Sequence, residues 1–497
     1  MTVSAPADGT PPLIPDASAQ AAHALRARPL GFGLLSIYGS GALVETVINF
    51  ALGQFLLFYL TIVCGLPGAL AGVVGLLSLT LDAFIDPLVG SLSDNMGGRF
   101  GRRHPFLLGA PIPAGLTLVL VFSIPSHFSG VALFACATLL SLAVRVGLSC
   151  FQVPYFALGA ELSDNYAERS TIVAARVAFG VLGTFLVTAL SYGLFLSGKG
   201  ATTHAAAYLP LMLSFAAIIV FGGFLSGFGT LGARGRLHAA PPGAGPRLAA
   251  LWVEVREIFR NRSFRVLFSA ILLFFVAQGL AGPLTLYANT YFWKITTLQI
   301  RDLTFIFTGG LAVGIVLTGI ASRWFEKRTV ALTGVFLYLA SQLIPAPLRV
   351  MGLLPTTGSV MLVLTIAVIA LGLGTSAALI GYQSMMADAA DEHQLLFGAR
   401  REGLYFAGIN FSAKASSGLG ILLAGIVLDL IGFPHGIGSL GAGAHIAPGT
   451  VQALGLIYGP GAAIVSFMSV LILFAYKLDR AKHATILEAL GRSPAAT

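Results

Sequence analysis

The chain has 497 residues, of which 56% are hydrophobic and only 10% are charged. Soluble domains carry roughly 25% charged residues, so this composition excludes a soluble globular protein and indicates a surface that faces lipid. The formal net charge of +9 would fit a nucleic-acid-binding protein only if the basic residues gathered on one folded face, and their positions along the chain exclude such a partner.

Residues 1–30 form a tail that is rich in alanine and proline and precedes the first apolar segment. The tail contains Arg26 and Arg28 and lacks the apolar core of a signal peptide. We therefore expect a disordered cytoplasmic tail.

Apolar segments of about 20 residues, long enough to cross a bilayer, recur along the whole chain. We predict twelve spans, starting near residues 32, 67, 106, 130, 171, 207, 266, 302, 329, 358, 404 and 452, most of them roughly 20 to 28 residues long. The predicted parts are the tail at 1–30, a six-helix bundle at 31–229, a cytoplasmic loop at 230–265, a second six-helix bundle at 266–478 and a cytoplasmic tail at 479–497.

Basic residues concentrate in alternate connections. With the N-terminus inside, 22 of the 29 Lys and Arg residues lie on the cytoplasmic side and three lie within spans. The four on the other side are Lys199, Lys294, Arg301 and Arg349. This asymmetry predicts that both termini are cytoplasmic, and it makes the basic surplus a matter of membrane topology and not of nucleic-acid binding.

Six ionisable residues fall inside predicted spans, where each costs roughly 2.5–3.5 kcal/mol at the helix centre. Three are acidic and three are basic, which predicts a shared polar cavity in which the charges compensate one another. They are Glu45, Asp82, Asp86, Arg145, Arg176 and Lys414.

Asp82 and Asp86 of the second span share one helix face, because they are four residues apart. Two carboxylates so close repel each other, so a bound cation or a proton on one of them must relieve the repulsion. We therefore predict that this pair couples transport to a cation. The alternative is a structural ion pair with a buried base. This alternative does not easily explain two acids, because one acid would satisfy one base.

The connection DNMGGRFGRRHP after the second span combines a glycine turn, basic residues and an aspartate at a helix end. We predict a charge lock on the cytoplasmic face that favours the outward-facing state. The alternative is that the arginines only set the membrane topology. The residues of the predicted lock are Asp94, Arg99, Arg102 and Arg103.

A polar stripe follows the fourth span, a pattern typical of a wall that faces a solute. Isolated polar groups in such a stripe could also join neighbouring helices by hydrogen bonds. The stripe consists of Arg145, Ser149, Gln152 and Phe156; the first span adds Glu45 and Asn49, and the eleventh adds Asn410, Lys414 and Ser417.

Two pairs of connections indicate an internal repeat. RFGRRHP after the second span is echoed by RWFEKRTV after the eighth, and GAELSDNYAERS after the fourth is echoed by SMMADAADEH after the tenth. The offset is close to 225 residues in both cases. Two copies of a six-helix unit predict the fold of the major facilitator superfamily, an all-α membrane protein with a binding site between the halves.

No nucleotide, zinc or hydrolase motif occurs, so we expect no enzyme activity, no cofactor and no metal site. The three cysteines, Cys64, Cys136 and Cys150, lack the spacing of a metal site or a disulfide framework. The energy for transport is therefore expected to come from an ion gradient.

The residues from about Leu34 to Phe433 resemble the glycoside-pentoside-hexuronide:cation symporters. The resemblance rests on several motifs in the family's order: DAFIDPLVGSLSDNMGGRFGRRHPF, VPYFALGAELS, SMMADAADE, RREGLYF and AKASSG. It implies a symporter of a small polar solute, a sugar or glycoside, that resides in the bacterial cytoplasmic membrane and functions as a monomer.

The resemblance also implies roles for single residues. Asp82, Asp86, Ser149 and Lys414 take the positions of the cation site. The solute-site positions are Glu45, Thr46, Gln152, Phe156 and Arg176, to which Asn49, Arg145 and Asn410 are added from the polar faces described above.

Several positions depart from the family pattern. Thr46 and Gln152 replace two sugar-binding aspartates, and Arg145 adds a positive charge. An anionic sugar such as a uronide is therefore one hypothesis for the solute. Glu45 argues against it, because its carboxylate could neutralise Arg145. Ile85 replaces an asparagine of the sodium site and offers no oxygen ligand, so a proton is predicted over sodium as the coupling ion.

Two other functions stay open. A carrier of a lysolipid or another amphiphile could use the same fold and aspartate pattern. A receptor that transports nothing is the third alternative.

Overall fold

The computed structural model describes residues 29–96, 99–124, 128–163, 165–198, 200–236, 256–354, 357–398, 401–440 and 446–492. These residues form helices and connections without a strand. Twelve segments are long and apolar enough to cross a membrane, and each starts within five residues of its predicted position. The longest, from Gly358 to Phe397, exceeds the predicted length because the helix continues through the acidic sequence DAADEH.

The first six spans are built from α2 (Phe32–Gly39), α3 (Ala42–Ala51) and the π-helix η1 (Leu52–Leu56); α4 (Gly68–Asn95); α5 (His104–Gly109) and α6 (Pro111–Val121); α7 (Gly130–Glu161); α8 (Tyr166–Thr188) and η3 (Ala189–Phe195); and α9 (Ala205–Gly229). The last six are built from α11 (Arg262–Tyr287) and η6 (Ala288–Phe292); α12 (Thr297–Trp324); α13 (Lys327–Leu343) and α14 (Pro345–Val350); α15 (Thr357–Phe397); α16 (Glu402–Leu430); and α18 (Pro448–Leu456), η8 (Ile457–Gly461) and α19 (Ala462–Leu473). Short elements outside the spans are η2 (Tyr59–Val63), η4 (Ala201–Thr203), η5 (Leu231–Arg236), α17 (Ile437–Leu440) and α20 (Arg480–Ala489).

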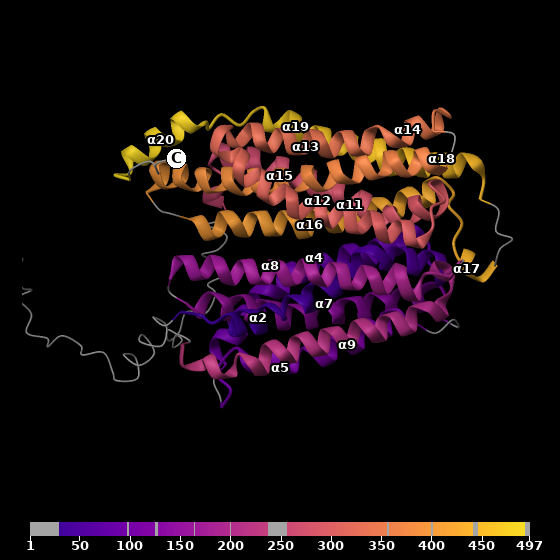
Figure 1. Ribbon diagram of the computed structural model, residues 1–497, viewed down its shortest axis with the longest axis horizontal. Helices are drawn as coiled ribbons and strands as arrows, with labels where there is room; N and C mark the ends of the chain where they lie inside the picture. Colours follow the sequence, from indigo (N-terminus) through magenta and orange to yellow (C-terminus); the bar gives the residue numbers. More distant parts are fainter. Residues whose placement is uncertain are drawn as a thin grey trace, which may run out of the picture.

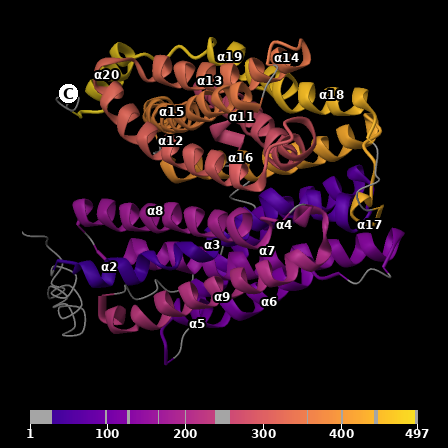
Figure 2. The same ribbon diagram turned by 45° about the vertical axis from the view of Figure 1, so that its right-hand side comes forward.

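The two sets of six helices lie side by side as two layers, with α2 to α9 in one and α11 to α19 in the other (Figures 1 and 2). We call them the first and the second half. We call the end that holds α20 the basic end, and the end that holds α17 the opposite end (Figure 1).

Local sequence explains where several helices begin. The side chain of Asn261 accepts a hydrogen bond from the backbone N–H of Phe264 at the start of α11. Thr296 and Gln299 form a capping box at the start of α12. Both motifs satisfy backbone donors that have no partner within the helix. These caps set where the first two spans of the second half begin.

Helices α4 and α16 join the two halves and approach closely near the opposite end. A Cβ atom at Gly425 would lie 2.0 Å from the carbonyl oxygen of Gly68, and one at Gly72 would lie 2.9 Å from the Cα atom of Leu422. The Asp429 carboxylate accepts hydrogen bonds of 2.7 Å from the backbone N–H groups of both Gly68 and Ala69. An aspartate of one half therefore caps a helix of the other, where the helix dipole favours negative charge.

Further contacts close the same end. The Tyr287 hydroxyl donates to the carbonyl oxygen of Leu57 over 3.1 Å and also hydrogen-bonds Thr61. The backbone N–H of Gly436 donates to the carbonyl oxygen of Thr61 over 2.8 Å. The ring of Phe58 packs edge-on against Tyr287 with centroids 4.9 Å apart. The opposite end is therefore closed by contacts between the halves.

Parts of the predicted organisation fall outside the described residues. They are most of the N-terminal tail, residues 237–255 of the central loop, and residues 493–497. In the described C-terminal segment, α20 lies against α15, because His483 and Arg492 contact Asp391 at 3.2 and 3.0 Å. The bundle boundaries themselves stay predictions.

Candidate functional site

A charge cluster joins the two halves midway along α4 and α16. The Nζ atom of Lys414 lies 2.8 Å from Oδ2 of Asp82, and it also hydrogen-bonds Oδ2 of Asp86. Asp82 is 2% exposed. The sequence argument that one base satisfies only one acid is wrong here, because the four-residue spacing directs both carboxylates of α4 at the same ammonium group.

The two carboxylates differ in their remaining partners. Oδ1 of Asp82 accepts a hydrogen bond of 2.6 Å from the Ser149 hydroxyl of α7. Oδ1 of Asp86 is buried and receives no hydrogen bond from any residue that the structure describes. Asp82 is thus fully engaged, whereas Asp86 keeps one free acceptor in the protein interior, where an unsatisfied polar group is unfavourable. Asp86 is therefore the carboxylate with room for a proton.

Arg145 lies buried beside this cluster. Its Nη1 atom donates to Oδ1 of Asn49 over 2.8 Å, and its positive charge interacts with Asp82 and Asp86. Two bases therefore balance two acids in one shared region, as charges held inside a membrane require.

A second group of side chains continues toward the basic end. The guanidinium carbon of Arg176 lies 4.2 Å from the ring centroid of Phe156, a cation–π arrangement. The charges of Glu45 and Arg176 interact, and Gln152 lies one helical turn before Phe156 on α7. An aromatic face, an amide and a balanced pair of charges are the groups that bind sugar rings and hydroxyls.

Two predicted residues stand apart from these groups. Thr46 lies against α8, where Cβ atoms at Gly180 and Gly183 would be 3.5 Å and 3.2 Å from its side chain. Asn410 is exposed, one helical turn from Lys414 on the same face of α16. The structure thus gathers most of the predicted solute-site residues but not these two.

The predicted lock at the basic end forms a cluster within the first half. Arg103 contacts Asp94 at 2.5 Å and Glu161 at 2.9 Å, and Arg102 contacts Glu161 at 2.8 Å. Arg99 makes different contacts. Its carbonyl oxygen accepts a hydrogen bond from Arg234, and its guanidinium carbon lies 6.0 Å from the ring centroid of Phe100.

The internal repeat explains this cluster. Lys327 contacts Asp388 at 2.7 Å in the second half, so each echoed pair of connections brings a base and an acid together. Glu161 was not among the predicted site residues, although it lies in the echoed segment GAELSDNYAERS. Asp429 was missed because its role as a cap needs a helix start from the other half.

The comparisons with known proteins agree with this architecture. Residues 37–480 match the family described as MFS/sugar transport protein. The chain belongs to this family. The resemblance to the glycoside-pentoside-hexuronide:cation symporters and the predicted fold of two six-helix bundles are thereby confirmed. Because the family and the relatives are transporters, the chain is an integral membrane transporter and not an enzyme.

Several curated relatives match nearly the whole chain. An uncharacterized symporter of Synechocystis sp. is 26% identical over 94% of this chain and 98% of its own length. The isoprimeverose transporter of Lactiplantibacillus pentosus is 25% identical over 78% of each chain. A putative sulfoquinovose importer of Escherichia coli is 26% identical over 92% of each chain.

A solved structure shares the fold at low sequence identity. A D-xylose-proton symporter has a TM-score of 0.60 and 12% identity, and the match covers 93% of this chain and 99% of that one. At this identity the likeness shows the arrangement of the helices alone.

Proposed function

We propose that the chain is a symporter that moves a sugar or glycoside together with a cation, favouring a proton over sodium, by alternating access. The observation that carries the proposal is that Lys414 of the second half contacts both Asp82 and Asp86 of the first. A proton that arrives on one carboxylate weakens its attraction to Lys414, so cation binding alters a contact between the halves. The relatives named as symporters support this function.

The choice of a proton rests on the surroundings of the two acids. Sodium prefers several oxygen ligands, and Ile85 between the acids offers none. A proton needs only one carboxylate oxygen, and Oδ1 of Asp86 has no hydrogen bond from the described residues. Protonation there would turn a buried acceptor without a partner into a neutral hydroxyl.

The solute is proposed to be a neutral sugar unit held beside Arg176, Gln152 and Phe156. Glu45 balances Arg176, and Asp82 and Asp86 balance Lys414 and Arg145, so no positive charge is left over for an anion. A uronide carboxylate would compete with Glu45 for the charge of Arg176. The name of the isoprimeverose transporter supports a sugar, and uptake assays with neutral and anionic sugars decide between the two.

The orientation follows from the basic residues. With the basic end and both termini at the cytoplasm of a bacterial cytoplasmic membrane, the closed opposite end faces outward and the structure represents an inward-facing state. One chain supplies both halves and both groups of site residues, so we propose that a monomer is functional.

Uptake into proteoliposomes tests the proposal. With an imposed pH gradient we expect accumulation of a neutral glycoside, and we expect Asp86→Asn to abolish accumulation while leaving exchange of the sugar across the membrane measurable. A sodium gradient that drives uptake after the pH gradient has been collapsed would contradict proton coupling. Competition by uronides but not by neutral glycosides would overturn the neutral solute, and competition by lysolipids alone would overturn the sugar.

A further inference from the structure

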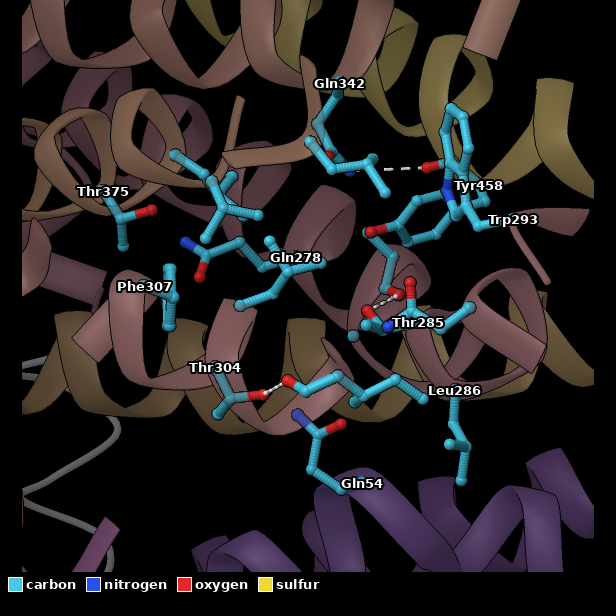
Figure 3. A pocket seen from close by; sticks show the side chains of 18 of the residues that line it. Gln54, Gln278, Thr285, Leu286, Trp293, Thr304, Phe307, Gln342, Thr375 and Tyr458 are labelled. Carbon is cyan, nitrogen blue, oxygen red and sulfur yellow. Dashed lines mark hydrogen bonds between the residues drawn. The ribbon is translucent and has the colours of Figure 1, made fainter. Parts of the chain in front are cut away.

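A cavity of about 300 Å³ lies in the second half and is bordered by Gln54 and Tyr192 of the first. Figure 3 shows Gln54, Gln278, Thr304 and Gln342 around it. None of the six ionisable residues predicted within the spans lines this cavity. The cavity is therefore a different chemical environment from the site around Lys414.

The lining combines uncharged hydrogen-bonding groups with aromatic rings, the composition of pockets that hold neutral polar ligands. A sugar ring presents hydroxyls that both donate and accept at its edge and an apolar face that packs on aromatic rings. Amides, hydroxyls and aromatic rings can supply these contacts without a charged group. The lining supplies amides from Gln54, Gln278, Asn289 and Gln342, hydroxyls from Thr285, Thr304 and Thr375, and rings from Trp293, Phe307, Tyr338 and Tyr458.

Gln278 of α11 provides a donor that has no partner. Its Nε2 atom is buried and has no hydrogen bond within the described part of the chain. Nearby hydroxyls are used differently: Thr285 donates to the carbonyl oxygen of Ala281 over 3.0 Å, and Thr304 donates to that of Ile300 over 2.8 Å. Both threonine oxygens therefore remain acceptors. A free donor opposite free acceptors is complementary to a hydroxyl group.

The internal repeat relates this cavity to the charge cluster. Gly65 and Lys294 each follow a π-helix with positive φ, of 75° and 53°, and mark equivalent ends of the first and seventh spans. They are 229 positions apart, and so are Asn49 and Gln278. Asn49 binds Arg145 in the charge cluster, whereas Gln278 faces a cavity without charges. Two amides separated by this offset thus lie in different surroundings, one charged and one neutral.

We infer that this cavity is a second sugar site that binds an uncharged sugar ring through Gln278 and Thr304, with Trp293 beside the ring. The identity of the ligand as a sugar rests on the proposed function. The absence of charge in the lining selects against anionic sugars, because a carboxylate would be desolvated there without a counter-charge.

Fluorescence of Trp293 in the full-length purified protein tests the inference. Trp293 is 4% exposed and lines the cavity, so replacing Trp252 and Trp324 by phenylalanine leaves one reporter at the site. Xylose, glucose and galactose are the neutral probes, and glucuronate is the anionic one. We expect a saturable change in emission with at least one neutral sugar and at least tenfold weaker binding of glucuronate.

Two variants assign the site. Gln278→Leu and Thr304→Val each remove hydrogen-bonding groups with little change in size, and we expect about tenfold weaker binding of the neutral sugar, the factor that corresponds to a loss of about 1.4 kcal/mol. The threonine variant keeps the test valid if Gln278→Leu does not fold. Arg176→Gln in the candidate solute site is expected to leave binding at Trp293 within twofold.

The outcomes separate this inference from the proposed function. No saturable change with any neutral probe, or unchanged affinity in both variants, overturns the second site even if proteoliposomes take up sugar. Binding that depends on Gln278 in a protein that takes up no sugar supports the site and overturns the symport. Equal binding of glucuronate would contradict a neutral site.

Discussion

The two ends of the molecule hold their charges in different ways. At the opposite end, Asp429 of the second half caps α4 of the first, and backbone approaches at Gly425 leave no room for side chains. At the basic end, the ion pairs of Arg103 and Lys327 lie within their own halves. The first arrangement holds the two halves together, and the second connects helices within each half.

The difference explains how one chain can open at either end. Contacts that cross between the halves must break for the opposite end to open, whereas contacts within a half can persist while the halves move as rigid bodies. Lys414 lies between the two ends and contacts acids of the other half, so these contacts depend on how the two halves are arranged. Changes at the opposite end should therefore shift the conformational equilibrium more than changes at the basic end.

The largest effect is expected from Gly425→Ala, because the added methyl group would push α16 away from α4 at the opposite end. The new Cβ atom would lie 2.0 Å from the carbonyl oxygen of Gly68, and backbone cannot move aside as a flexible side chain can. We expect sugar uptake by proteoliposomes to fall by about a hundredfold, corresponding to about 2.7 kcal/mol, because the opposite end no longer closes. Gly403→Ala is the control on the same helix, since a Cβ there meets nothing within 4 Å. Equal uptake by the two variants would contradict a role of this contact in closing the opposite end.

A smaller shift is expected from Asp429→Asn, which removes the charge of the cap but keeps an acceptor. Charge-assisted hydrogen bonds are about twice as strong as neutral ones, so we expect about a tenfold population shift toward the state with the opposite end open. A cysteine at position 410, exposed here, reports this shift by slower alkylation once Cys64, Cys136 and Cys150 have been replaced.

Asp302→Asn is the matched control for this measurement, because Asp302 pairs with the adjacent Arg301 within the second half. Its alkylation rate should stay within twofold of the parent. Faster alkylation in Asp429→Asn would reverse the proposed role of the cap.

The smallest effect is expected from Asp94→Asn at the basic end. Asp94 has a side chain that is 54% exposed, and exposed ion pairs contribute about 0–1 kcal/mol. If the cluster around Arg103 favours closure of this end, alkylation of the cysteine at position 410 should become about two to three times faster, opposite to the effect at Asp429. Asp391→Asn, an acid of the second half at the same end, is the control. No change in Asp94→Asn would remove this residue from the predicted lock.

The sequence predicted the positions of the candidate site more completely than their contacts. Asp82, Asp86, Ser149 and Lys414 meet as a group, which the family resemblance implied. The shared use of Lys414 by both acids was not predicted, because side-chain direction across two helices cannot be obtained from spacing on one of them. The missing partner Glu161 has the same explanation, since it lies 58 residues from Arg103 along the chain.

The sequence by itself determined the twelve spans, their order and the positions of the buried charges, because the length of an apolar segment and the cost of a charge in lipid are local properties. Only the tertiary structure decided which end is closed, which acids share a base and where a neutral cavity forms. Each of these depends on helices that are distant in sequence, as with Lys414 and Asp86, which are separated by 328 residues. The twelve-helix chain thus acquires its candidate sites from the packing of two halves that the repeat had indicated.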